Sequence, residues 1–197
     1  ESDYTTSFFS KKSTTVAGIT GQTNYDSKTF DWIRSVAIDN DNNLYVLDQN
    51  RHQVTKWAPG ASEGVIVAGG DGSLNYPRGL YVDENKNIYI ADTGNHRVVK
   101  WAPDASEGVI VAGGNGSGTA LNSLTYPRGV SVNDGKVYVM DTDNRRVVRW
   151  DNGASEGVVV AGGNGAGSTL DKLRAARDIH VDSNENVYIL DTDNHRV

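Results

Sequence analysis

The chain contains no cysteine and only one methionine among its 197 residues. Without cysteine it can form neither a disulfide nor a thiolate metal site, and either redox compartment is compatible with this absence. No apolar run approaches the roughly 18 residues that a membrane-spanning helix needs, so we expect no membrane partner. The sequence starts at Glu1 without a signal-peptide pattern, which favours a fragment or a processed piece and leaves the compartment open.

Basic residues are also in the minority. Lysine and arginine together number 19, against 25 aspartates and glutamates, so the net charge is −6. A nucleic-acid-binding domain usually carries a basic footprint, and this balance therefore favours a protein partner over a nucleic acid. Glycine, by contrast, is abundant at 22 residues, which indicates a turn-rich globular chain.

The sequence is organised around a repeated unit. Its clearest copy is Ile88–Trp101 (IYIADTGNHRVVKW), which recurs at Leu44–Trp57 and Val137–Trp150 and begins again at Val187. Each copy runs from an apolar segment through an aspartate and a polar turn to a second apolar segment. This pattern predicts two strands joined by a turn.

The period of the repeat predicts the architecture. The arginine that opens each unit recurs at intervals of 44, 50 and 49 residues. A period in the forties with about four short strands is typical of a β-propeller blade, and no helical periodicity extends over ten residues. We therefore predict an all-β propeller of four-stranded antiparallel blades in a single domain, 1–197. Three blades are complete (34–69, 78–113 and 128–162) and one is partial (177–197).

The partial blade lacks outer strands, and the start of the chain offers one. Val16-Ala17-Gly18 aligns with Val67-Ala68-Gly69 at the end of a complete unit. We therefore predict that residues 14–18 form an outermost strand against His195–Val197, which would remove a free sheet edge. Whether so few blades close a ring is left open.

The combined pattern Tyr76-Pro77-Arg78-Gly79, then Ile88–Asp92, then Thr93–Val98 resembles the NHL-repeat family. The resemblance covers residues 14–197. The first unit departs from it with Ile33 in place of the proline, and the fourth with Ala176. The resemblance implies a β-propeller, commonly of six blades, so the chain resembles either part of a larger propeller or an unusually small ring.

Two charged positions recur in every unit and are the main candidate binding residues. One is the arginine that opens each unit, and the other is the aspartate that ends its second strand. The loops that carry them leave the same end of a blade, so we expect the arginines to lie near the aspartates. They could form a charged rim that binds a ligand, or a ring of Arg–Asp pairs that joins the blades; recurrence in each unit favours the ring of pairs. The positions are Arg34, Arg78, Arg128 and Arg177, and Asp48, Asp92, Asp141 and Asp191.

One position on the innermost strand varies between units while neighbouring valines recur. It is occupied by Ala37, Tyr81, Ser131 and His180. Variable positions near a propeller axis can be adapted to a ligand, so these residues are weaker candidates for a pocket lining. The competing interpretation, which we favour, is a loosely constrained packing position.

Histidine recurs at a turn position, as His52, His96 and His195, with Arg145 in the third unit. Imidazole is a good zinc ligand. The arginine argues against a ring of metal ligands, so we interpret this position as turn-stabilising. We expect no metal and no other cofactor.

No nucleophile elbow or Ser–His–Asp spacing is present, so we expect a non-catalytic binding scaffold with a protein partner. The resemblance leaves two alternatives. One is part of a six-bladed metal-dependent lyase or hydrolase, for which only His180 offers an inner-strand ligand. The other is the RNA- or substrate-binding end of a ubiquitin-ligase-type protein. Oligomeric state and glycosylation at Asn115 are not decided.

Overall fold

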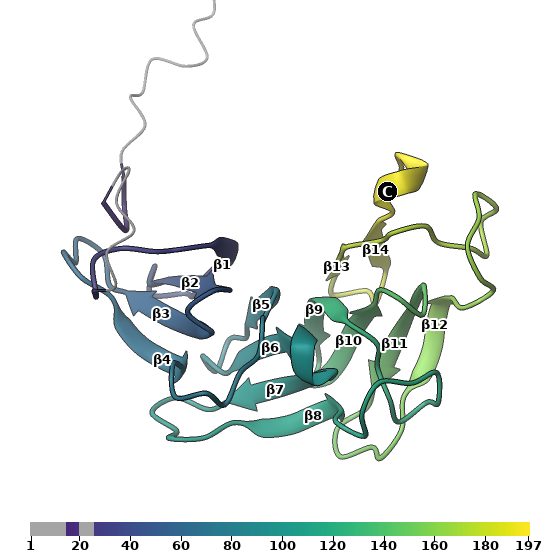
Figure 1. Cartoon of the computed structure of the whole chain (residues 1–197), viewed down its shortest axis with the longest axis horizontal. Helices are drawn as coiled ribbons and strands as arrows, with labels where there is room; N and C mark the ends of the chain where they lie inside the picture. Colours follow the sequence, from purple (N-terminus) through teal and green to yellow (C-terminus); the bar gives the residue numbers. More distant parts are fainter. Residues whose placement is uncertain (1–14, 20–25) are drawn as a thin grey trace, which may run out of the picture.

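The computed structural model describes residues 15–19 and 26–197. Their strands form three four-stranded antiparallel sheets and one two-stranded sheet. Figure 1 shows these sheets following one another in chain order along an open arc, with β1 at one end and β14 at the other. The helical segments described, η1 (Thr93–Asn95) and η2 (Thr192–Asn194), are single 3₁₀ turns, and neither could cross a bilayer.

Each sheet is one blade, and within it the strands are hydrogen-bonded in chain order. Blade 1 contains β1 (Ile33–Ile38), β2 (Leu44–Asp48), β3 (Gln53–Trp57) and β4 (Val65–Gly69), and blade 2 contains β5 (Gly79–Val82), β6 (Ile88–Asp92), β7 (Arg97–Trp101) and β8 (Val109–Gly113). Blade 3 contains β9 (Pro127–Asn133), β10 (Lys136–Asp141), β11 (Arg146–Trp150) and β12 (Val158–Gly162), and blade 4 contains β13 (Asp178–Val181) and β14 (Val187–Leu190). The predicted all-β architecture of four-stranded blades is confirmed.

The core lies between the blades. The second strand of a blade is apolar at nearly every position because both of its faces are covered, and all five residues of β6 are buried. On one side, Ile90 packs in a cluster with Tyr45 and Leu47 of blade 1. On the other side, Tyr89 packs in a cluster with Val130 of blade 3. Each inner blade is therefore stabilised by both of its neighbours.

Glycine lets the innermost strands of neighbouring blades approach closely. A Cβ atom on Gly79 would lie 2.0 Å from the carbonyl oxygen of Arg128, and one on Gly129 would lie 2.9 Å from the Cα atom of Asp178. These positions require glycine because the facing atoms belong to the backbone. The glycines after Arg78 and Arg128 thus set how closely β5 approaches β9 and how closely β9 approaches β13.

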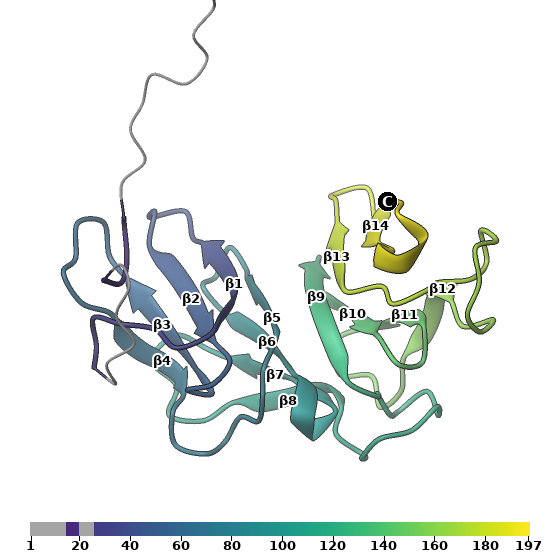
Figure 2. The ribbon, with the colours of Figure 1, turned by 45° about the horizontal axis from the view of Figure 1, so that its top comes forward.

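The predicted N-terminal strand is wrong over the residues that the structure describes; Thr14 lies outside them. Residues 15–19 form no strand, and β14 is paired with β13. The turn after β14 is held by an isolated bridge between Asp191 and Arg196 instead. Figures 1 and 2 both place residues 15–19 at the opposite end of the arc from the C-terminus. Three and a half blades span too small an angle to bring these segments together.

Candidate functional site

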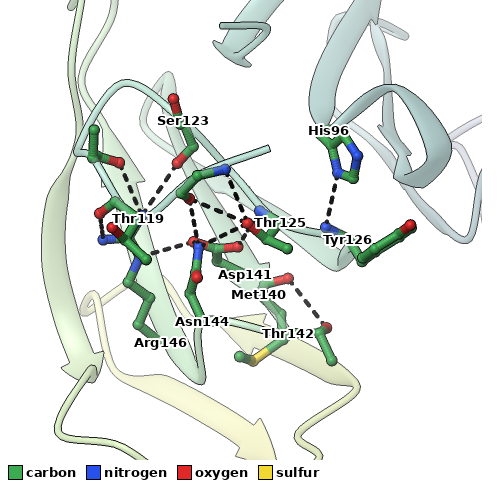
Figure 3. A network of polar contacts seen from close by, with 12 residues as sticks. His96, Thr119, Ser123, Thr125, Tyr126, Met140, Asp141, Thr142, Asn144 and Arg146 are labelled. Carbon is green, nitrogen blue, oxygen red and sulfur yellow. Dashed lines mark hydrogen bonds and ion pairs between the residues drawn. The ribbon is translucent and has the colours of Figure 1, made fainter. Parts of the chain in front are cut away.

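The aspartate that ends the second strand is buried and fixes a turn. In blade 3, Asp141 accepts hydrogen bonds from Nε of Arg146 and Nδ2 of Asn144, both at 2.8 Å, and from the backbone N–H of Thr125 at 2.7 Å. Figure 3 shows these contacts, with the Arg146 guanidinium reaching toward the loop that carries Thr119 and Ser123. One fully buried carboxylate thus joins the β10–β11 hairpin to the loop before β9.

The same arrangement recurs in blades 2 and 4. The arginine Nε to aspartate distance is 2.8 Å in both blades, and a backbone N–H of the preceding loop donates at 2.7 Å. The residues are Asp92 with Arg97, Asn95 and Asn75, and Asp191 with Arg196, Asn194 and Arg174. In blade 1, Gln53 replaces the arginine, and Arg51 provides the positive charge, with its Nε 3.6 Å from Asp48.

The expected pairing of these aspartates with the opening arginines is therefore wrong. The hairpin register places Asp92 directly opposite Arg97, and Asp141 directly opposite Arg146. The arginine on the third strand forms an ion pair with the aspartate, so these aspartates are buried and do not contribute to a charged rim on the surface. The missed residues, Arg97, Arg146 and Arg196, share one sequence signal: each follows its aspartate by five positions.

The pKa values of two equivalent aspartates shift in opposite directions. Desolvation raises the pKa of Asp141 and outweighs the lowering effect of its hydrogen bonds from Thr125, Asn144 and Arg146. Desolvation also acts to raise the pKa of Asp191, but there the hydrogen bonds from Asn194, Arg174 and Arg196 prevail, and the pKa is lowered.

Asp191 should therefore contribute stability that disappears in acid. A carboxyl group with a lowered pKa in the folded state stabilises the protein above its ordinary pKa of 3.8, and this contribution is lost as the pH falls through the folded value. We expect urea unfolding to show the wild type more stable than Asp191→Asn at pH 6, with the difference shrinking below pH ~4. A difference that stayed constant between these pH values would contradict this assignment.

The opening arginines meet one another instead of the aspartates. They converge on a hollow of about 240 Å³ on the inner side of the arc. It is lined by Arg34, Arg78, Arg128 and Arg177 together with Ser35, Gly79, Asp178 and Leu190. The sequence predicted the four arginines as a group, but the structure shows that they form a cluster of like charges.

This arginine cluster is electrostatically unfavourable in the free protein. Desolvation lowers the pKa of Arg78, and the charges of Arg128, Arg34 and Arg177 lower it further. Desolvation and the charges of Arg177 and Arg34 lower the pKa of Arg128 as well, and the carboxylate of Asp143 only partly offsets these effects at both arginines. Nε of Arg78 and Nε of Arg128 are buried and have no hydrogen-bond acceptor among the described residues. Buried donors are normally satisfied, so two unsatisfied ones beside a hollow indicate room for an anion.

Exposed aromatic side chains accompany the arginines. Trp32, Tyr76 and Tyr126 are all exposed, and each precedes the opening arginine of its blade by two residues. The guanidinium carbon of Arg34 lies 5.4 Å from the ring centroid of Trp32. In the fourth unit Ala175 takes the aromatic position. The loops around the cluster therefore combine positive charge with flat apolar surface.

The repeated histidines are turn residues. His52, His96, His195 and Arg145 all have a left-handed backbone, with φ between 51° and 55°, so the position is defined by its conformation. The ring of His96 lies 4.7 Å from that of Tyr126, and its Nδ1 accepts the backbone N–H of Tyr126 at 3.2 Å (Figure 3). The backbone conformation thus defines this turn position, and the imidazole of His96 contacts the loop before β9.

The variable inner-strand position does not line a common pocket. Ala37 and Tyr81 pack against the clusters between blades, and the hydroxyl of buried Ser131 accepts the backbone N–H of Val181 in blade 4 at 3.1 Å. His180 is exposed at the open end of the arc. The side chains face the next blade, because alternate residues of an inner strand point toward the two neighbouring sheets.

Histidine and carboxylate side chains do not gather into a metal-binding group within residues 15–19 and 26–197. The geometry of the described part of the chain thus gives the arginine cluster, and not a set of metal ligands, as its candidate site.

The site and fold can be compared with known proteins. Residues 74–101 and 124–150 match the family model of the NHL repeat. Among curated proteins, none matches the chain in sequence. Similar solved structures include an auxiliary nutrient binding protein from Bacteroides ovatus (TM-score 0.66, 16% identity, 86% of this chain and 48% of that one). Another is a chain of a nidogen/laminin complex (TM-score 0.61, 18% identity, 81% of this chain and 56% of that one). A third is a gluconolactonase from Xanthomonas campestris (TM-score 0.59, 16% identity, 84% of this chain and 60% of that one).

At these identities the likeness shows the fold alone, and this chain spans about half the length of the solved structures that it matches. The two matched segments lie in the second and third repeated units. The first and fourth units carry the same opening arginine and the same strand-ending aspartate, although the turn after the aspartate differs in the first unit. Residues 74–101 and 124–150 are therefore NHL repeats, and they lie in two of four successive sheets that have the β-propeller blade fold.

Proposed function

We propose that this chain is a non-catalytic binding module that holds an acidic segment of a partner protein over the arginine cluster. The observation that carries this proposal is the convergence of four arginines on one hollow, with two buried Nε donors unsatisfied. A carboxylate placed there accepts paired hydrogen bonds from a guanidinium and relieves the repulsion between the arginines. The electrostatic repulsion that is relieved on binding therefore contributes to the affinity.

The surroundings of the cluster support a protein partner. Trp32 lies against Arg34, and Tyr76 and Tyr126 are exposed two residues before Arg78 and Arg128. Trp, Tyr and Arg are the residue types that contribute most to protein interfaces. The chain as a whole carries a net charge of −6, so the positive region is local and suits a short acidic segment better than a long polyanion.

The similar structures support a binding role without identifying the partner. They include a nutrient binding protein and a chain of a nidogen/laminin complex, but also a gluconolactonase. One blade architecture thus accompanies different functions, and the argument for binding depends on the arginine cluster of this chain.

Substituting Arg128 with glutamine should weaken the binding of poly-L-glutamate, used as a probe, at least tenfold in isothermal titration calorimetry. The same substitution should leave the melting temperature unchanged or raise it, because it removes one of four mutually repelling charges. Arg149→Gln is the matched control, since Arg149 lies on β11 in an ion pair with Asp151.

Two results would contradict the proposed function. Equal affinities of the Arg128→Gln and Arg149→Gln variants would show that the cluster does not bind the acidic probe. Tighter binding of single-stranded RNA than of poly-L-glutamate, with a steep dependence on salt, would favour a nucleic-acid-binding module.

A further inference from the structure

In blades 1 and 3, the start of the outer strand is bound to the loop that precedes the blade. In blade 3 the carbonyl oxygen of Leu121 accepts the backbone N–H of Gly157, directly before β12, at 2.8 Å. In blade 1 the carbonyl oxygen of Ser27 accepts the backbone N–H of Gly64, directly before β4, at 2.9 Å. We call residues 117–122 of the loop before blade 3 the anchoring segment.

An arginine holds the same part of the loop. In blade 3 the guanidinium of Arg146 donates to three loop carbonyl oxygens, among them that of Thr119 at 2.7 Å and that of Ser123 at 3.2 Å. Figure 3 shows Arg146 beside this loop. Arg196 donates to three loop carbonyl oxygens in blade 4, and Arg51 donates to two in blade 1. A short stretch of backbone carbonyls is therefore the usual partner of this arginine.

Blade 2 lacks the anchoring segment. Its preceding loop has three residues between Gly70 and Leu74, whereas the loop before blade 3 has nine residues at the same place. Gly108 occupies the position of Gly157, directly before β8. Among the described residues, no backbone carbonyl accepts the N–H of Gly108 as that of Leu121 accepts the N–H of Gly157.

The arginine of blade 2 also has fewer partners. Within residues 15–19 and 26–197, the guanidinium of Arg97 donates to Asp92 and to one loop carbonyl oxygen, that of Ser73 at 2.7 Å. The side chain of Arg97 is 25% exposed, whereas those of Arg146 and Arg51 are 8% and 7% exposed. Because a guanidinium carries five N–H groups, Arg97 is able to donate further hydrogen bonds at this place.

A hollow of about 360 Å³ lies between blades 1 and 2 beside the short loop. It extends along β4 as far as Gly69 and reaches Asp71. The corresponding hollow between blades 2 and 3 stops at Val111, on the side where the anchoring segment is present. The exposed side chains of Asp71 and Asp104 line the hollow between blades 1 and 2, so it favours a neutral or basic occupant over an acidic one.

We propose that blade 2 binds a short, neutral or basic segment of a partner protein in the place of the anchoring segment. Backbone carbonyl oxygens of the bound segment accept hydrogen bonds from the N–H of Gly108 and from the guanidinium of Arg97, as the loop carbonyls do in blade 3. This site differs from the arginine cluster in place and in charge, because it lies along the outer strand β4 and is lined by carboxylates.

An NMR titration of the isotope-labelled 197-residue chain tests this proposal. The probe is the capped, uncharged peptide acetyl-Ser-Gly-Thr-Ala-Leu-Asn-amide, which has the sequence of residues 117–122. It should shift the amide resonance of Gly108 and the Nε–H resonance of Arg97, with a dissociation constant of about 1 mM or lower. The amides of Gly64 and Gly157 should not shift, because their acceptors are already in place.

A variant that fills the place within the chain is the matched control. Inserting a second copy of residues 117–122 between Gly72 and Ser73 gives blade 2 a loop as long as that of blade 3. In this variant the peptide should no longer shift Gly108. Exchange of the Gly108 amide with solvent should become about tenfold slower than in the wild type, and similar to that of Gly157. Circular dichroism would verify that the insertion preserves the fold.

Three results would overturn the proposal. A wild-type Gly108 amide that exchanges as slowly as that of Gly157 without peptide would show that this chain, or another copy of it, already occupies the place. Peptide binding that the insertion variant retains would locate the peptide elsewhere. No shift of Gly108 at about 10 mM peptide would show that the place holds only solvent. Because the peptide is uncharged, these results do not depend on whether the arginine cluster binds poly-L-glutamate.

Discussion

Asp141→Ala is expected to lower the free energy of unfolding by about 3–5 kcal/mol, the typical effect of removing one partner from a buried ion pair. The substitution would leave Nε of Arg146 and the backbone N–H of Thr125 without their acceptor in a buried site. Arg146 would remain held by carbonyl oxygens such as that of Thr119, at 2.7 Å, and could not move to water freely. The uncompensated charge is the main reason for the large effect.

Urea unfolding monitored by tryptophan fluorescence would measure this change. Asp151→Ala is the matched control, because Asp151 also pairs with an arginine, at 2.9 Å from Nε of Arg149, but its side chain is exposed. An exposed ion pair contributes about 0–1 kcal/mol, so the control should be close to the wild type. Similar losses in both variants would mean that the buried turn does not stabilise the blade as described.

Gly79→Ala is expected to lower the free energy of unfolding by about 1–3 kcal/mol or more, as overpacking does in a close-packed site. The added Cβ would lie 2.0 Å from the carbonyl oxygen of Arg128. Because this oxygen belongs to the backbone of β9, the strands β5 and β9 would have to move apart. The arginines that these strands position would move with them, so binding of poly-L-glutamate should weaken as well.

Thermal and urea unfolding of Gly79→Ala and Gly118→Ala would be compared. Gly118 is a suitable control because a Cβ there would meet its nearest neighbour, the Cβ of Ser123, at 3.4 Å, which is ordinary contact. A surface substitution of this kind usually changes stability by less than about 0.5 kcal/mol. If Gly79→Ala were as stable as the control, the glycine after the opening arginine would not set the distance between blades.

The strands could be predicted from the sequence because their signals are local. The apolar run Ile88–Asp92 and the turn at Thr93–Asn95 recur with a constant spacing, and each hairpin joins segments only a few residues apart. The partner of the aspartate was missed although it too is local. We expected the aspartates to lie near the opening arginines, whereas the antiparallel register places Arg97 opposite Asp92.

The predicted strand at residues 14–18 failed for a different reason. A sequence match to 65–69 shows that a segment is able to form an outer strand, but not that a partner strand lies within reach. The partner depends on the angle through which successive blades turn. With this number of blades, the two ends of the arc stay apart (Figure 2).

The repeat by itself determined the blade, its four strands and the presence of one arginine and one aspartate in each unit, because these features follow from periodicity and turn chemistry within a few residues. Only the tertiary structure decided that the aspartates are buried in turns and that the arginines of different blades meet around one hollow. These outcomes depend on distances between residues 44 to 50 positions apart, which are set by the close packing of one sheet on the next.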